Sequence, residues 1–178
     1  MDLSAAWPYL EAVAAERLLN NITERHVSMY GPEIELLGAA GELAARRFFQ
    51  VSEQLHTHFD QGADIVYKDI RIDVKATHWT PKVLRRHLQW AIWKQIRADV
   101  ILLTAINLQQ KSAILVGYAL PHEILRAPVN EDRFIACHEI PVPRLRKPSK
   151  LLFMECKDDL YVRPQTQTDD RLHRHRPS

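Results

Sequence analysis

The sequence predicts a mixed α/β (α+β) fold in one domain, with a central mixed β-sheet flanked by helices. Three observations support this prediction. Residues in the first third of the 178-residue chain recur at helical spacing, and two pairs of strand-like segments follow between residues 64 and 120. Hydrophobic residues make up 46% of the chain, which at this length is enough for a core without disulfide or metal support.

Two helices are expected within residues 4–50. The first is indicated by residues that recur at helical spacing, which are Leu10, Val13, Ala14, Arg17 and Leu18. The second begins at Pro32 and runs to about Phe49. Its expected buried face consists of Ile34, Leu37, Gly41, Ala44, Ala45 and Phe48. Gly38 and Gly41 would let another element approach closely, and Glu42 lies at the edge of this face, where its carboxylate can point into a cleft.

Two strand pairs are expected after the helices. Their ranges are 64–67 with 70–77, and 100–106 with 113–120. Lys68 and Asp69 form a plausible two-residue turn in the first pair, and this turn places Asp64 directly opposite Asp73. Side chains alternate along a strand, so Asp73 and Lys75 share a face.

Residues 1–162 are expected to form the single domain. Its parts are the N-terminal helices at 4–50, a core at 38–120, and smaller elements at 121–162 that include a short helix at 121–125, a strand at 135–142 and a loop with a short helix at 143–153. Residues 163–178 contain one apolar residue, Leu172, and are expected to be a disordered tail.

The formal charge of +2 hides an uneven distribution. Residues 1–64 hold 4 basic and 10 acidic side chains, whereas the rest of the chain holds 20 basic and 12 acidic ones. Residues 74–98 contain no acid, and this basic segment also carries Trp79, Trp90 and Trp93. Basic side chains interleaved with aromatic ones suit phosphate contact and base stacking. The alternative is a solvated basic surface with the tryptophans in the core.

The composition also bears on location and on metal content. No apolar run approaches the length of a membrane helix, and the acidic N-terminal stretch is unlike a signal peptide, so we expect a cytoplasmic protein without a membrane partner. Cys137 and Cys156 are too few for a disulfide framework. With His138 they also fall short of the four ligands of a structural zinc site. His56, His58 and Asp60 are weak candidates for metal ligands.

The stretch from Asp64 to Lys75 carries the expected chemistry. Two carboxylates that converge beside a lysine form a site for a hard divalent cation. Asp64, Asp73 and the carbonyl of Val74 would be a sufficient protein contribution to Mg²⁺ binding. Lys75 could position or deprotonate an attacking water. The alternative is a surface ion pair between Asp73 and Lys75.

This pattern resembles the PD-(D/E)XK nuclease superfamily, which has a restriction-endonuclease-like fold. In that family a helix glutamate, an aspartate ending one strand, and an acidic-x-lysine triplet on the next strand form a metal-dependent site. The matching positions here are Glu42, Asp64, Asp73 and Lys75. Ala63 stands where the motif has proline. The resemblance covers residues 38–120.

The resemblance implies a Mg²⁺-dependent deoxyribonuclease that hydrolyses phosphodiester bonds in DNA, with Mn²⁺ as a substitute metal. Glu42 would support the metal or its water. The residues expected to hold the DNA backbone are Arg71, Lys82, Arg85, Arg86, Lys94 and Arg97. Endonuclease activity is favoured because the chain shows no extra domain to encircle a strand. Small members of the family often dimerise, so a homodimer is one expected assembly.

Two alternatives remain open. One is a catalytically inactive module that keeps the nuclease fold and binds nucleic acid or protein. The other is a nuclease subunit of a larger assembly. Intact Lys75 and both aspartates favour the enzyme.

Overall fold

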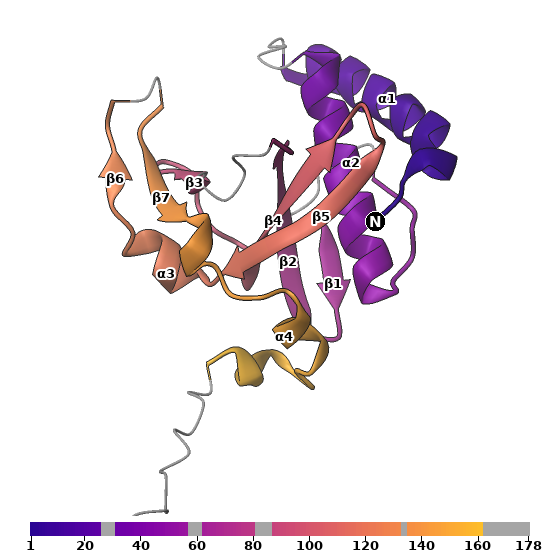
Figure 1. The fold of residues 1–178 in the computed structure, drawn as a ribbon. Coiled ribbons are helices and arrows are strands. Elements are labelled where there is room, and N and C mark those ends of the chain that lie inside the picture. The colour runs from indigo at the N-terminus through magenta and orange to yellow at the C-terminus, as the bar shows by residue number, and fades with distance from the viewer. Residues whose placement is uncertain (26–30, 57–61, 81–86, 133–134, 162–178) are drawn as a thin grey trace, which may run out of the picture.

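The computed structural model of the protein describes residues 1–25, 31–56, 62–80, 87–132 and 135–161, with backbone alone for residues 22–25. A mixed sheet lies at its centre (Figure 1), with the strand order β1-β2-β4-β5. The strands are β1 (Ile65–Tyr67), β2 (Ile70–His78), β4 (Val100–Asn107) and β5 (Ser112–Ala119). β2 and β4 run parallel, and the other two neighbouring pairs are antiparallel. Helices flank the sheet, so the predicted mixed α/β class with a central mixed sheet is confirmed.

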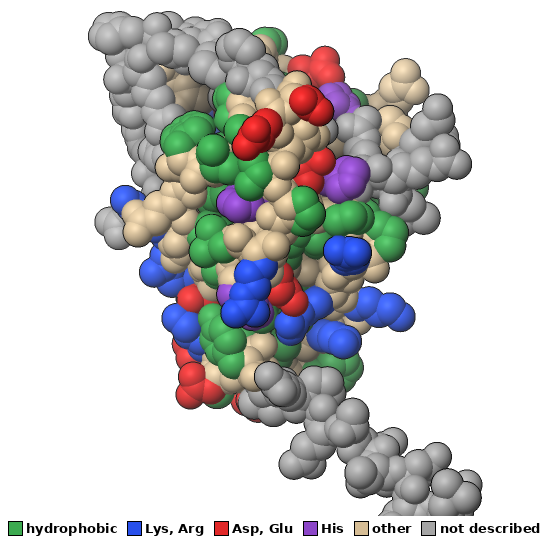
Figure 2. All heavy atoms as spheres, turned by 90° about the vertical axis from the view of Figure 1, so that its left-hand side faces the viewer, with side chains coloured by type: hydrophobic (Ala, Val, Ile, Leu, Met, Phe, Trp, Pro, Cys, Tyr) green, Lys and Arg blue, Asp and Glu red, His purple; other side chains and the backbone are tan. Residues whose placement is uncertain are grey.

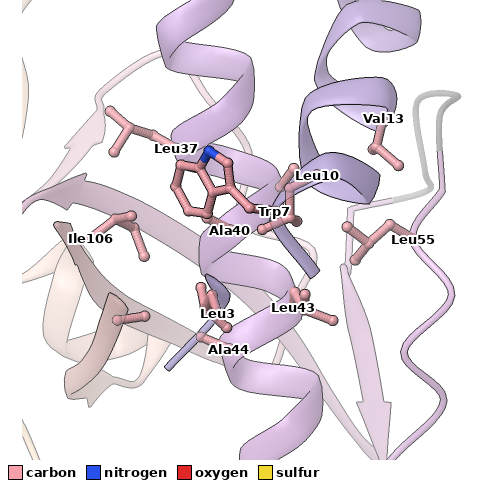
Figure 3. Close-up of a cluster of buried hydrophobic side chains, with 12 residues drawn as sticks. Leu3, Trp7, Leu10, Val13, Leu37, Ala40, Leu43, Ala44, Leu55 and Ile106 are labelled. Carbon is pink, nitrogen blue, oxygen red and sulfur yellow. The ribbon is translucent and has the colours of Figure 1, made fainter. Parts of the chain in front are cut away.

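The two long helices pack together on one face of this sheet (Figure 1). They are α1 (Trp7–Arg25) and α2 (Pro32–Phe49), close to the predicted ranges. Figure 3 shows the apolar cluster they form, in which Trp7 lies against Leu37 and Ala40 of α2. α1 covers one side of α2, and the sheet covers the other side. For this reason α2 buries more residues than the single apolar face of an amphipathic helix would. Ile34 is exposed, however, so its predicted place on the buried face is wrong.

One glycine of α2 sets how closely the helix approaches the sheet. A Cβ on Gly41 would lie 2.5 Å from Oγ1 of Thr104 and 3.0 Å from Cβ of Ala76. The close approach predicted there is confirmed. The same prediction for Gly38 is wrong, because a Cβ at Gly38 would have nothing within 4 Å. The backbone of α2 therefore rests on β2 and β4 at Gly41.

The first hairpin has the predicted register at three pairs, whereas the predicted pair of Asp64 with Asp73 falls outside β1. Ile65 pairs with Ile72, Val66 with Arg71 and Tyr67 with Ile70. Lys68 turns the chain with a φ of 54°, a left-handed conformation that is uncommon outside glycine. The inward residues Ile70, Ile72 and Val74 pack toward α2 in one apolar cluster with Ala45 and Phe49. Asp73 and Lys75 consequently lie on the opposite face of the sheet.

A second sheet covers that opposite face, and the sequence did not predict it (Figure 1). Its strands are β3 (His87–Ala91), β6 (Val129–Asn130) and β7 (Cys137–Pro141), in the order β3-β7-β6. β7 confirms the strand predicted in residues 135–142, whereas β3 lies in the segment interpreted as basic and aromatic. Leu88 and Trp90 of β3 pack against Ile101 and Leu103 of β4, so the two sheets share a core.

The remaining described elements are short. They are the helices α3 (Pro121–Leu125) and α4 (Ser149–Leu152) and the 3-10 turns η1 (Ser4–Ala6), η3 (Val142–Arg144) and η4 (Lys157–Leu160). α3 and α4 match the predicted short helices. The expected disordered tail lies outside the described residues. In the described ranges, no helix has both the length and the apolar character needed to cross a membrane.

Gly41→Ala should lower the stability of the fold by about 1–3 kcal/mol, because the added methyl group meets Thr104 and Ala76. Gly38→Ala is the matched control in the same helix, where the methyl group meets nothing and alanine stabilises a helix by up to about 1 kcal/mol. Urea denaturation followed by circular dichroism measures both. Equal effects of the two substitutions would contradict the close packing at Gly41.

Candidate active site

Asp73 and Lys75 form an ion pair on β2. The Lys75 ammonium donates to Oδ1 of Asp73, and the Asp73 side chain is buried. The alternation of β2 places both side chains on the face toward the second sheet, while Val74 packs toward α2. A surface ion pair, the alternative interpretation of these two residues, is therefore wrong for Asp73, because its carboxylate is removed from solvent.

Asp64 is fixed by hydrogen bonds at three of its atoms. It lies one residue before β1, and its N–H donates to the Ile72 carbonyl at 2.9 Å. Its carbonyl accepts from Nη2 of Arg46 at 2.6 Å, and its Oδ2 accepts from the Val74 N–H at 2.6 Å. The Asp64 carboxylate thus bonds the backbone beside Asp73. In an extended strand the N–H and C=O of one residue point to the same side, so the Val74 carbonyl also faces Asp64.

Glu42 enters the site from α2 with a partner that the sequence did not predict. Its two carboxylate oxygens accept from Nη1 and Nη2 of Arg17 at 2.7 and 2.6 Å. Glu42 is buried, so it is not the solvated helix residue that was the alternative interpretation. Arg17 also donates to the His56 carbonyl through Nε at 2.8 Å. The arginine therefore joins α1, α2 and the segment after α2.

The charges of Glu42 and Asp73 both act on Asp64. Burial, together with the charges of Glu42 and Asp73, raises the pKa of Asp64 to about 8, although Lys75 and the hydrogen bond from Val74 act in the opposite direction. Burial alone would lower the pKa of Arg17, but its hydrogen bonds to Glu42 and the charges of Glu42 and Asp64 raise it. Glu42, Asp64 and Asp73 are from here on called the acid cluster.

A second lysine lies beside the acid cluster. Lys94 follows β3, and its Nζ lies 5.1 Å from the ring centroid of Trp90. Nζ of Lys75 lies 5.2 Å from the same centroid, so two ammonium groups share one indole ring. Burial and the nearby Lys75 lower the pKa of Lys94, whereas Asp73 and Asp64 raise it, and the net direction is downward. Lys94 was predicted as a DNA-backbone contact, and the structure places it next to the acids.

Of the other predicted DNA contacts, two lie next to each other and three are undescribed. Arg71 is exposed on β2, and its guanidinium donates to the carbonyl of exposed Arg97. The remaining three, Lys82, Arg85 and Arg86, lie outside the described residues. Further exposed basic side chains, which the sequence did not single out, come after β5 in the chain: Arg126, Arg144, Lys147 and Lys150. Figure 2 shows Lys and Arg side chains gathering over the middle and lower part of the face that carries α3 and β7.

The tryptophans of the basic segment divide between core and surface. Trp90 is 3% exposed, so the alternative interpretation, a tryptophan in the core, is confirmed for this residue, and it cannot stack on a base. Its indole Nε1 donates to the Lys94 carbonyl at 2.7 Å, and the ring packs in the core between the two sheets. Trp79 and Trp93 are exposed and remain available for stacking.

A metal site is not preformed among the described residues. No group of three or more His, Cys, Asp and Glu side chains there is arranged to hold a metal ion. Each carboxylate instead has a protein partner: Arg17 pairs with Glu42, Lys75 pairs with Asp73, and the Val74 N–H donates to Asp64. The weak ligand candidates His58 and Asp60 lie outside the described residues, while His56 uses its carbonyl to accept from Arg17.

Comparisons with known proteins give no relative for this chain. No family model, no curated protein and no solved structure matches it.

Arg17→Met should destabilise the protein by about 3–5 kcal/mol, because it leaves the buried Glu42 carboxylate without its cation. The double variant Arg17→Met with Glu42→Leu should regain most of that loss. Arg47→Met is the matched control, since Arg47 pairs with Glu53 at 3.0 Å in a more exposed ion pair worth at most about 1 kcal/mol. Urea denaturation measures all three. Similar losses for Arg17→Met and Arg47→Met would contradict a buried structural pair.

The stability of the metal-free protein should fall as pH rises from about 5 to 8. Asp64 keeps its proton in the folded state up to about pH 8. The unfolded chain loses that proton near pH 4 and so binds fewer protons in this window. The free energy of unfolding then decreases by at most about 1.4 kcal/mol per pH unit.

Thermal denaturation in EDTA, compared between wild type and Asp64→Asn, isolates this contribution. The variant should gain stability relative to wild type as pH rises, and added Mg²⁺ should raise the melting temperature of wild type at pH 8 more than that of the variant. Asp132→Asn, which changes an exposed aspartate between β6 and β7, should follow wild type. Parallel pH profiles for wild type and Asp64→Asn would disprove the raised pKa.

Proposed function

We propose that the protein is a metal-dependent nuclease that hydrolyses phosphodiester bonds in DNA, with a restriction-endonuclease-like core of the PD-(D/E)XK type. One observation carries the proposal: a helix glutamate, an aspartate before one strand and an Asp-x-Lys triplet on the next belong to one electrostatically coupled cluster. The parallel strand β4 beside β2 supports the same core. An endonuclease is favoured, as is a homodimer that would meet both strands of a duplex.

The acid cluster fits a hard divalent cation such as Mg²⁺, with Mn²⁺ as a substitute. Its donors are all oxygen atoms, from the carboxylates of Asp64 and Asp73 and the carbonyl of Val74. The raised pKa of Asp64 supports this fit, because burial and the neighbouring charges of Glu42 and Asp73 disfavour its ionised form, and a cation would offset both effects. Glu42 fits a supporting role, since both its oxygens are held by Arg17.

Bound there, the metal would polarise a phosphoryl oxygen and lower the pKa of a water molecule for in-line attack. The chain's own residues supply positioning and charge. Asp73 would exchange its ion pair with Lys75 for the metal, and the released ammonium could then orient the attacking water or the scissile phosphate. Lys94 lies close enough to share that task. Arg71, Arg97 and the other predicted backbone contacts would hold the DNA strand.

A second candidate is a module with the same fold that binds nucleic acid or protein without cleaving it, alone or in a larger assembly. One observation favours it. Every carboxylate of the acid cluster already has a protein partner, as it would in a cluster that never binds a metal. The two candidates differ in their response to Mg²⁺.

The deciding experiment incubates supercoiled, linear, single-stranded and branched DNA with the purified protein, with and without Mg²⁺ or Mn²⁺. We expect metal-dependent cleavage of at least one substrate. Asp73→Asn and Lys75→Gln should each reduce the rate by roughly 100-fold or more, the usual range for removing a group that handles a proton or its water. The controls Asp132→Asn and Lys111→Gln alter exposed residues outside the site.

Circular dichroism and melting temperatures would show that each variant is folded. No cleavage of any substrate, or equal cleavage by wild type and Asp73→Asn, would refute the nuclease. DNA binding without cleavage would favour the binding module instead.

A further inference from the structure

The turn after β3 presents two apolar side chains to solvent. Ile92 is 53% exposed and Trp93 is 75% exposed, whereas Trp90, three residues before Trp93, is buried at 3%. Exposing a large aromatic ring leaves favourable burial energy unused. Isolated exposed apolar residues are ordinary, but two adjacent ones beside a charged cluster suit a ligand with an apolar face.

Hydrogen bonds hold this turn in place. The Ile92 N–H donates to the Ala136 carbonyl at 3.2 Å, and the Lys94 N–H donates to the Ala91 carbonyl at 3.0 Å. The Trp90 indole donates to the Lys94 carbonyl at 2.7 Å, which ties the turn to a ring buried between the two sheets. The backbone that carries Trp93 is therefore preorganised, so binding a ligand would cost little conformational entropy in this turn.

The turn also adjoins the acid cluster. Lys94 follows Trp93 directly, and its ammonium shares the ring of Trp90 with that of Lys75. The charges of Asp73 and Asp64 also interact with the Lys94 ammonium. Trp93 thus stands one residue from a cation at the proposed site of cleavage. Within residues 74–98 all six Lys, Arg, Asp and Glu side chains are basic. A segment with this charge favours an anionic partner over a protein whose surface carries both signs of charge.

We propose that the turn Ile92–Lys94 is a nucleotide subsite, in which the Trp93 indole stacks on a base and the Lys94 ammonium binds the adjoining phosphate. The two faces of a base inside a duplex are covered by its neighbours, so stacking on Trp93 requires an unpaired or splayed base. The substrate inferred is therefore DNA with unpaired nucleotides, either a single strand or a branched junction. This inference rests on the proposed function, whose site it extends.

The test measures fluorescence anisotropy of labelled DNA with the full-length protein in EDTA, where no cleavage occurs. The probes are a single-stranded oligonucleotide, a blunt duplex of the same sequence and a fork with splayed arms. Trp93→Ala should weaken binding to the single strand and the fork by about tenfold and leave the blunt duplex unchanged. Trp93→Phe should keep most of the affinity, because phenylalanine retains an aromatic face.

Phe153→Ala is the matched control, since Phe153 follows α4 and is exposed at 83%. It should leave all three affinities unchanged. Lys94→Gln should weaken binding to all three probes and reduce the salt dependence of binding, whereas Lys111→Gln in the β4–β5 turn should not.

Three results would overturn the subsite. They are unchanged binding by Trp93→Ala, an equal loss on duplex and single strand, or a loss matched by Phe153→Ala. The first of these would leave Ile92 and Trp93 as a surface for a protein partner. Failure of the subsite is distinguishable from failure of the nuclease. If only the subsite proposal fails, the wild-type protein still cleaves DNA with Mg²⁺. If the nuclease proposal fails, the wild-type protein cleaves no DNA.

Discussion

Three carboxylates share one partly buried region of the protein, and the repulsion that Glu42 and Asp73 exert on buried Asp64 is the constraint on which its other features depend. Glu42, Asp64 and Asp73 come from α2, from the residue before β1, and from β2. Like charges removed from water are costly unless cations or protons offset them. The fold supplies both, with Arg17 on Glu42, Lys75 on Asp73 and a retained proton on Asp64.

The structural core keeps these charges close together. Gly41 lets α2 rest on β2 and β4, and the next residue along the helix is Glu42. Arg46, one turn further along α2, donates to the Asp64 carbonyl. The helix thus contributes one carboxylate and fixes the backbone of another. The same packing that forms the apolar core also determines the electrostatics of the site.

The sequence predicted the local half of this arrangement. A two-residue turn and the alternation of side chains were enough to place Asp64 beside Asp73 and Lys75, because both effects act over a few residues. Arg17 was harder to predict, since its partner lies on another helix. The only indication of its role in the sequence was that Arg17, a charged residue, stands among the residues that recur at helical spacing in α1. β3 was missed because its alternation of Leu88 and Trp90 is short and its partner β7 comes much later in the chain.

The pairing of β3 with β7 also makes the site depend on a late part of the chain. β3 lies between the parallel strands β2 and β4 in the chain, yet Gln89 pairs with Glu139. A nascent chain that has emerged as far as Ala119 already contains the acids and all four strands of the central sheet, but it lacks the strand that holds β3. The ring of Trp90 and the turn that carries Lys94 therefore depend on a strand from much later in the chain. The carboxylates and the lysine beside them thus belong to two parts of the chain, and a truncation before Cys137 would keep the acids and remove the strand that holds β3.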